Sequence, residues 1–429
     1  MNTLILFCDK KKVAFLKFDA NKEEFSFEYT DYWKENGFEL SPCMKFEVKI
    51  SSKTIRNFVE NLLPEGQGRE ILTNFHHISK NNIFGLIQII GKETTGALTF
   101  SLKDIVLETS FREIPESELA ERIRNRKSIP IEVWDGKARL SVAGVQDKLP
   151  ITIIDSKFGF GEGELASTHI LKFEKDTDNI VFNEFLSLKL ASEAGLLVTN
   201  TKLIKIEDQE VLLIKRFDRK LIDNSTIKRK HIIDACQALD LSVSHKYERA
   251  FGSGDMKDYR EGASFKKIFS LVGNCDSPIL AKKNLITWIC VNLCLGNSDA
   301  HGKNLSFLIE KNSMILTPFY DIINITVYDN KYETDFAMGI NEAFNYDELG
   351  TYDFVEFCEE LNINVKGFVK EFKRVSNQIN KSLDNPTLVE LSNENKIEFF
   401  KKYKNDVQER IKKLTPMIDY CVKYISNSK

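Results

Sequence analysis

The sequence predicts an α+β protein of more than one lobe, with strands gathered in the first half of the chain and helices in the second. Before residue 30, apolar residues alternate or run in short stretches separated by polar turns, which is the pattern of a β-meander. Beyond residue 231, apolar residues recur at three- and four-residue intervals, as in helices. A chain of 429 residues is too long for one small core, so we expect three parts. They are residues 1–130, 131–230 and 231–429.

The first part is predicted to be a small unit of strands and helices. Its meander strands lie at 3–8, 13–18 and 24–29. A helix is expected from Ser52 to Leu63, with Ser51 or Ser52 as its N-cap and Pro64 at its end. Later elements are a helical pattern at 73–90, strand character at 91–102 and a charged helix at 113–127.

The second part follows the order strand, turn, strand, strand, helix, strand, strand. Residues 138–154 predict a strand, a turn and a strand, and a loop with three glycines is expected at 156–164. Lys172 lies in an apolar strand at 168–174, before an amphipathic helix at 183–195. The last two strands are expected at 201–206 and 210–217.

The third part is predicted to be helical, apart from one hairpin. The apolar periodicity is strongest at 265–272 and 281–295. The other expected helices lie at 233–239, 352–363, 366–383, 394–413 and 416–426, and the hairpin strands at 305–309 and 314–318.

The composition is that of an ordinary globular protein. The net charge is −3, from 60 basic and 63 acidic residues, which excludes sequence-independent binding to nucleic-acid backbones as the main activity. The eight cysteines are scattered without a Cys-x-x-Cys pair, which favours reduced core cysteines in a cytoplasmic protein. The N-terminus has no signal-peptide pattern, and no apolar run reaches about 18 residues, so no membrane is expected.

A polar loop, Gly296 to Asn304, separates two apolar segments and is the first candidate for chemistry. Asp299 and Asn304 are five residues apart, the spacing of the base and the metal-binding Asn in a protein-kinase catalytic loop. Asp321 ends the next apolar stretch, where a second magnesium ligand is expected. Taken alone, the loop is equally well explained as an ordinary polar turn.

Phosphoryl transfer gives each of these residues a role. Asp299 would accept the proton of the attacking hydroxyl, and Asn304 and Asp321 would hold magnesium through oxygen atoms. Lys172 would pair with the α- and β-phosphates of ATP, and Glu184 either steadies that lysine or lies on the helix surface.

Several further candidates keep two interpretations. The turn from Ser141 to Lys148 either covers the phosphates with backbone N–H groups or is a plain hairpin. His301 either touches the γ-phosphate or hydrogen-bonds the loop backbone, and Lys303 is either a phosphate contact or a solvated lysine.

Taken together, these motifs resemble the HipA family of bacterial serine/threonine kinase toxins. The matching segments occur in order along nearly the whole chain. They are Asn61–Glu65, Gly96–Leu98, Ser141–Leu149, Thr168–Lys172, Asn183–Glu184, Arg216–Arg219, Asp234 with Gln237, Gly296–Asn304 and Thr317–Asp321.

The resemblance implies a two-lobed protein-kinase-like fold related to lipid kinases (PI3/4-kinase-related), with an N-terminal α/β subdomain and an all-helical C-terminal lobe. It implies ATP and Mg²⁺ as cofactors and a phosphate loop formed by Ala143, Gly144, Val145, Gln146, Asp147 and Lys148. It places Asp234 and Cys236 at the adenine hinge, where Ile233 replaces the usual glutamate. It also implies self-inactivation by autophosphorylation at Ser141.

The same resemblance implies partners. These are a small helix-turn-helix antitoxin of the HipB type, operator DNA bound through the antitoxin complex, and a protein substrate such as an aminoacyl-tRNA synthetase. Growth inhibition through phosphorylation of a translation-related protein is the leading hypothesis. The alternatives are a kinase-fold binding module that acts mainly as a transcriptional corepressor, and a kinase that acts on a lipid or a small molecule.

Overall fold

The computed structural model describes residues 2–104, 108–139, 147–174, 178–252, 254–385 and 394–427, with nothing assigned to the side chain of Asn330 or to those of residues 394–395. The chain forms two compact units, each assembled from three separate stretches. Unit 1 comprises residues 1–174, 199–243 and 306–317. Unit 2 comprises residues 175–198, 244–305 and 318–429.

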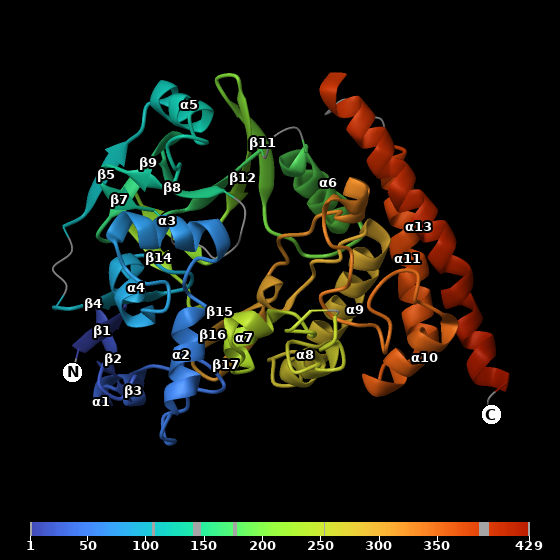
Figure 1. Ribbon diagram of the computed structural model, residues 1–429, viewed down its shortest axis with the longest axis horizontal. Coiled ribbons are helices and arrows are strands. Elements are labelled where there is room, and N and C mark those ends of the chain that lie inside the picture. The colour runs from blue at the N-terminus through green and yellow to red at the C-terminus, as the bar shows by residue number, and fades with distance from the viewer. Residues whose placement is uncertain are drawn as a thin grey trace. The chain divides into compact units, whose positions relative to one another are not determined.

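Unit 1 begins with the predicted meander, which is confirmed. Strands β1 (Asn2–Cys8), β2 (Lys11–Asp19) and β3 (Glu24–Tyr29) join β4 (Leu98–Ser101) in the antiparallel order β3-β2-β1-β4 (Figure 1). The helix predicted at residue 52 is also confirmed as α2 (Ser52–Glu60), because Ser51 accepts a hydrogen bond from the N–H of Thr54 as its N-cap. The short helix α1 (Asp31–Asn36) follows β3.

The single helical pattern predicted at 73–90 is wrong, because two helices cover this region. Helix α3 (Gly66–His76) ends where His77 adopts a left-handed backbone conformation with φ +50°. Helix α4 (Ile83–Ile90) then begins at Asn82, whose side chain accepts from the N–H of Gly85. A left-handed residue and a new N-cap therefore interrupt an apolar pattern that is continuous in sequence.

The central element of unit 1 is a six-stranded sheet in the order β11-β12-β10-β8-β9-β5. The strand predicted to carry Lys172 is confirmed as the third strand in this order, β10. The six strands are β5 (Ser110–Glu113), β8 (Lys148–Ile154), β9 (Lys157–Glu162), β10 (His169–Phe173), β11 (Thr201–Ile206) and β12 (Gln209–Lys215).

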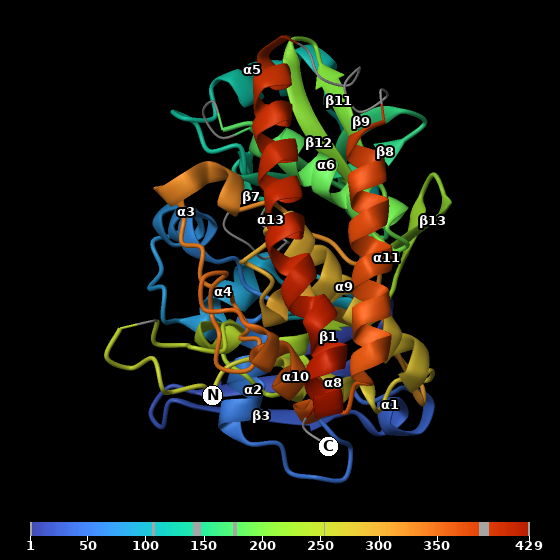
Figure 2. The same cartoon turned by 90° about the vertical axis from the view of Figure 1, so that its right-hand side faces the viewer.

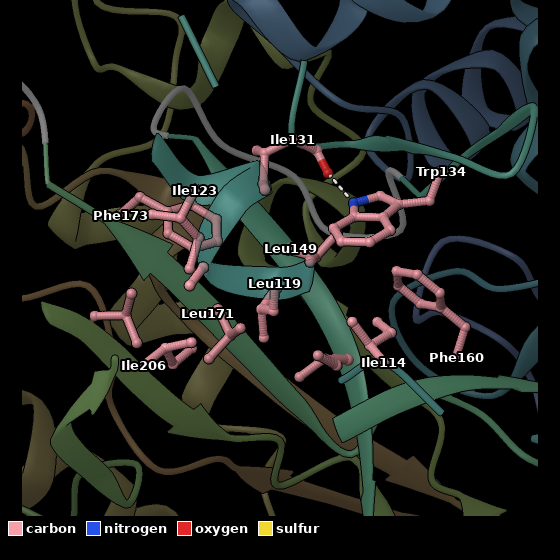
Figure 3. Close-up of a cluster of buried hydrophobic side chains, with 13 residues drawn as sticks. Ile114, Leu119, Ile123, Ile131, Trp134, Leu149, Phe160, Leu171, Phe173 and Ile206 are labelled. Atoms are coloured by element: carbon pink, nitrogen blue, oxygen red, sulfur yellow. Dashed lines mark hydrogen bonds between the residues drawn. The ribbon is translucent and has the colours of Figure 1, made fainter. Parts of the chain in front are cut away.

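One face of this sheet packs under helix α5 (Glu116–Arg124) in a dry cluster. Figure 3 shows Leu149 and Leu171 from neighbouring strands beneath the helix, with Trp134 beside Phe160. The indole N–H of Trp134 donates to the carbonyl of Ile131, so the buried ring leaves no polar atom unpaired. Burial of these side chains fixes the register of the strands that carry Lys148 and Lys172.

The glycine-rich loop predicted at 156–164 is wrong, because most of it is strand β9. Gly159 and Gly161 lie within the strand, where an added Cβ would lie 2.4 Å from the ring of Phe111 and 2.5 Å from Cβ of Leu165. These glycines therefore serve close packing between segments instead of a flexible turn.

Unit 1 also contains short elements that the periodicity does not reveal. The helix predicted at 233–239 is reduced to α7 (Ala235–Ala238), because residues 232–234 pair as a strand with the predicted hairpin. The short strands are β6 (Val133–Trp134), β7 (Lys137–Ala138), β13 (Arg219–Asp223), β14 (Thr226–Arg229), β15 (Ile232–Asp234), β16 (Ser306–Glu310) and β17 (Ser313–Leu316).

The regular elements of unit 2 among its described residues are helices, joined by loops that contain two isolated β-bridges. Helices α11 (Val365–Leu383) and α13 (Glu394–Asn427) run side by side along the unit, and α10 (Thr351–Glu360) lies near one end of them (Figure 2). The remaining helices are α6 (Ile180–Glu193), α8 (Phe265–Val272) and α9 (Pro278–Leu295), with 3₁₀ helices at η2 (Gly302–Asn304) and η3 (Thr326–Lys331); η1 (Val243–Lys246) lies at the junction of the two units.

The two helices predicted at the C-terminus are one, because α13 continues through Pro416. Its buried residues Ile411, Leu414, Ile418 and Cys421 keep helical spacing across the proline. Packing of this face therefore outweighs the one backbone hydrogen bond that proline removes.

The sequence predicts no membrane-spanning segment. By length and hydropathy alone, α9 is a candidate membrane span among the described helices. However, 61% of its 18-residue window is buried within the protein. Trp288, Cys290 and Cys294 of this helix are at most 1% exposed. Helix α9 is therefore the core helix of unit 2. The eight cysteines are free, as predicted.

Candidate active site

The loop of residues 296–304 leaves α9 in a left-handed turn and is held by backbone hydrogen bonds. Gly296 has φ +77°, and a Cβ there would lie 2.2 Å from Oγ1 of Thr326, so glycine is required. The carbonyl of Gly296 accepts from the N–H of Ile325 at 3.0 Å, and the carbonyl of Ser298 accepts from the N–H of Ala337 at 2.8 Å. Two later segments of the chain therefore position the loop.

Asp299 is the only residue of this loop that is not buried. Its neighbours Ser298 and Ala300 are 2% and 8% exposed. The hydroxyl of Tyr247 donates a hydrogen bond to Oδ1 of Asp299 at 2.9 Å. Asp299, the predicted base, is thus the most exposed residue of the loop.

Asn304 is buried and oriented by the base itself. Its Nδ2 donates to the backbone carbonyl of Asp299 at 2.9 Å, so the carboxamide oxygen is the atom left for a cation. Asp321 has a left-handed backbone with φ +57°, a conformation that recurs at functional sites. The neighbouring Phe319 fixes this segment through its N–H, which donates to the carbonyl of Leu197 at 2.8 Å.

Both donors are oxygen atoms, which fits magnesium, because Mg²⁺ takes one or two protein ligands and completes its shell with water and phosphate oxygens. Among the described residues, no three His, Cys, Asp or Glu side chains gather as a metal site.

His301 and Lys303 are both 7% exposed. The ring of His301 packs edge-on against Tyr247, with 5.3 Å between the ring centroids. The backbone carbonyl of Lys303 accepts from the hydroxyl of Tyr320 at 2.8 Å. These two contacts join the loop to tyrosines that lie outside it in the sequence.

In unit 1, the sheet register sets two lysines side by side. Lys172 of β10 pairs directly with Lys148 of β8, so both side chains lie on one face. They are 7% and 8% exposed. Like charges on directly opposed residues are destabilising, and buried lysines require compensation. Each lysine also interacts with other groups of the protein, and the pair gives this face of the sheet a local positive charge.

A buried carboxyl that the sequence did not reveal lies near this pair. Burial raises the pKa of Glu132 to about 7, and the charge of Asp147 adds to the shift while that of Lys148 opposes it. Glu132 is 4% exposed. Its carboxyl group is thus partly uncharged at neutral pH, which limits its repulsion of an anion held at Lys148.

The predicted hinge residues lie in unit 1 at the end of β15. Oδ1 of Asp234 accepts from the N–H of Gln237 at 2.8 Å, and Oε1 of Gln237 accepts from the N–H of Asp234 at 3.1 Å. Asp234 therefore caps α7 in a capping box. Cys236 is fully buried. The predicted residues Ser141, Ala143, Gly144, Val145 and Gln146 lie outside the described residues.

Two models of known protein families match this chain. The HipA-like C-terminal domain matches residues 140–383 and the HipA N-terminal domain matches residues 4–101.

The chain belongs to the HipA family.

It is 38% identical over 408 residues to the serine/threonine-protein kinase toxin HipA of Shewanella oneidensis, covering 94% of each chain. It also matches the solved complex of HipA, HipB and operator DNA from Shewanella oneidensis, with a TM-score of 0.89 and 37% identity. That alignment covers 98% of this chain and 99% of the other. The family predicted from the motifs is confirmed.

The HipA-family motif Arg216–Arg219 has a structural role within unit 1. Arg216 donates from Nε and Nη2 to Asp218 at 2.9 and 2.7 Å, and Arg219 donates from Nη1 to Oδ2 of the same carboxylate at 2.7 Å. The N–H of Gly96 is a fourth donor, at 3.0 Å. Arg219 also donates to the carbonyls of Gly96 and Thr94. These bonds join the two matched HipA domains.

Unit 1 also contains a cavity of about 1220 Å³. It is lined by side chains of α4, β9 and β14, and none of the described residues predicted for the active site borders it. The described residues predicted for the active site therefore lie outside this cavity.

Tyr247 and Glu132 are the two residues near the predicted groups that the sequence did not reveal. Tyr247 lies 52 positions before Asp299, and no motif surrounds either residue. Only a structure or an alignment of relatives can show that these two residues lie near the predicted groups.

Proposed function

We propose that this HipA-family protein is an ATP-dependent protein serine/threonine kinase with a two-lobed, lipid-kinase-related fold. The observation that carries the proposal is the loop 296–304, in which Asp299 is the one residue that is not buried and Asn304 donates a hydrogen bond to its backbone carbonyl. A buried loop that presents one carboxylate is what proton removal from a hydroxyl requires.

Each candidate residue has a role in this proposal. Asp299 removes the proton of the acceptor serine or threonine. Lys148 and Lys172, which lie on one face of the sheet, hold phosphate oxygens. Asn304 and Asp321 bind Mg²⁺, which when bound neutralises the charge on the phosphates. In the same proposal, His301 and Lys303 support the loop, Asp234 and Cys236 border the adenine, and residues 143–147 cover the phosphates.

We further propose that the kinase is a cytoplasmic toxin with a HipB-type antitoxin and, through it, operator DNA as partners. The support is the structural match to the Shewanella oneidensis complex of HipA, HipB and operator DNA. Its substrate in this proposal is a translation-related protein such as an aminoacyl-tRNA synthetase. Autophosphorylation at Ser141 would switch the kinase off, because a phosphate at the phosphate loop repels ATP.

Transfer of labelled phosphate from ATP to protein substrates tests the enzyme. We expect Asp299→Asn to lower the rate by about 100- to 10,000-fold, as is usual when a general base is lost. The control is Asp347→Asn, because this carboxylate is exposed and bonded only to Lys413 among the described residues. Equal rates for wild type and Asp299→Asn contradict the assignment of the base. Labelling of lipid extracts instead of protein supports the lipid-kinase alternative.

Growth of cells that express each variant separates the toxin from a corepressor. Arrest by wild type but not by Asp299→Asn supports a catalytic toxin, whereas arrest by both favours the binding module. Comparison of phosphopeptides between the two cultures identifies the substrate. Ser141→Ala should abolish the self-modified peptide, and an unchanged peptide refutes the switch.

A further inference from the structure

Tyr247 supplies the described hydrogen bond to the carboxylate of the predicted base. Its hydroxyl lies 2.9 Å from Oδ1 of Asp299. Within the described part of the chain, no other side chain bonds this carboxylate. Both side chains are half-buried, so the contact is screened from water more than a surface pair is.

The ring of Tyr247 is held from two directions. His301 of the loop packs edge-on against it at an interplanar angle of 85°, and Nζ of Lys246 lies 5.2 Å from its ring centroid. Aromatic and cation–π contacts each favour one ring orientation. The hydroxyl is therefore aimed at Asp299 before any substrate binds.

The backbone around Tyr247 is tied to the same loop. The N–H of Glu248 donates to the carbonyl of Ala337 at 2.8 Å, and the N–H of Ala337 donates to the carbonyl of Ser298 at 2.8 Å. A Cβ at Gly262 would lie 1.7 Å from the carbonyl oxygen of Tyr247. This close approach permits only glycine and fixes where the tyrosine leaves the backbone.

A carboxylate base has two oxygens, and which of them reacts depends on its orientation. A hydrogen bond to Oδ1 restricts rotation of the group and leaves Oδ2 available to a substrate. We propose that Tyr247 is a positioning residue for the base, holding Oδ1 of Asp299 so that Oδ2 receives the proton of the acceptor hydroxyl. This inference rests on the proposed kinase function.

The step balances within that function. The proton of the serine or threonine hydroxyl passes to Oδ2 of Asp299 while its oxygen forms a bond to the γ-phosphorus of ATP. The bond from that phosphorus to the β–γ bridging oxygen breaks, and its electron pair leaves with ADP. Tyr247 itself neither gains nor loses a proton.

The test compares two Tyr→Phe variants that each remove one hydroxyl bonded to a carboxylate. Tyr247→Phe should lower kcat about tenfold and leave the KM for ATP within twofold of wild type, because the base is misoriented while nucleotide binding is untouched. The control is Tyr332→Phe in unit 2, whose hydroxyl donates to Oδ2 of Asp178 at 2.9 Å. This control should keep the wild-type kcat.

A double variant separates positioning from mere structural support. If Tyr247 acts through Asp299, the variant Tyr247→Phe/Asp299→Asn should be no slower than Asp299→Asn alone. A further tenfold loss in the double variant, or a wild-type kcat for Tyr247→Phe, overturns the inference. Rates are referred to the fraction of protein that binds a fluorescent ATP analogue, so misfolded protein does not count as slow enzyme.

The two proposals fail differently. A wild-type protein that binds the nucleotide analogue but transfers no phosphate to protein refutes the kinase. An active wild type with an equally active Tyr247→Phe refutes only the role of the tyrosine.

Discussion

Replacing Asp218 by asparagine tests whether the buried ion network of unit 1 holds the two matched HipA domains together. The carboxylate is 5% exposed, and Arg216 and Arg219 are 3% and 1% exposed. Burial alone raises the pKa of Asp218, but the charges of Arg216 and Arg219 outweigh this and hold the pKa below its usual range. The variant keeps the shape of the side chain and removes its charge.

The expected loss follows from the four donors. Three of them meet Oδ2 and one meets Oδ1, so an asparagine whose oxygen replaces Oδ2 leaves Nε of Arg216 facing an amide –NH₂. One unsatisfied buried donor costs about 1–3 kcal/mol, and the other three bonds lose their charge assistance. Removing one partner of a buried ion pair costs about 3–5 kcal/mol. We expect a loss of about 4 kcal/mol in the free energy of unfolding.

Urea unfolding followed by tryptophan fluorescence measures this loss, because Trp33 and Trp134 lie in unit 1. The control is Asp208→Asn, which removes an Arg–Asp pair with Arg124 on the surface of the same unit and should change little. The difference between wild type and Asp218→Asn should shrink as pH falls below about 4, because the depressed pKa stabilises the fold only while Asp218 is charged. A loss below about 1 kcal/mol at pH 7 refutes the reasoning.

Three further outcomes follow from other sites. Gly262→Ala should lower kcat by at least tenfold, because the added methyl group displaces the backbone of Tyr247; a wild-type kcat contradicts this. Burial lowers the pKa of His231 to about 4, from about 6.5 in the unfolded chain. The contribution of this histidine to the free energy of unfolding is therefore complete above about pH 6.5 and should fall by about 3 kcal/mol as the pH drops to about 4. The variant His231→Gln should lack this pH-dependent loss. Leu171→Ala should lower the free energy of unfolding by about 2–5 kcal/mol in urea, since this side chain is fully buried beneath α5.

The sequence predicted those elements that depend on residues close together in the chain. The N-cap Ser51, the strand of Lys172 and the hairpin after Asn304 follow from periodicity and turn residues, and each is confirmed. The incorrect predictions concern elements that depend on contacts between residues far apart in the sequence. The glycines of strand β9 suggested a loop. In the structure they allow close packing against Phe111 and Leu165, a contact that the sequence alone does not reveal.

The candidate site divides in the same way. Asp299 and Asn304 are close in sequence, so their spacing revealed the loop, and the structure adds the bond between them. The lysine pair depends on strand register, and Tyr247 on a tertiary contact across 52 positions. Neither is encoded in a short motif. The roles proposed for all of these residues, and for Asp234, Cys236 and Ser141, stay predictions.

The discontinuity of unit 1 has a consequence for synthesis on the ribosome. Strand β15 pairs with β16, with Ile232 opposite Leu308, so unit 1 is incomplete until residue 317 of the 429 has been made. Until then, the nascent chain exposes an unpaired strand edge, which is a site for chaperones or misassembly. A product of premature termination before that point lacks the hairpin, as well as Asp321. If the protein is the proposed toxin, an active kinase therefore requires translation past residue 321 of the 429.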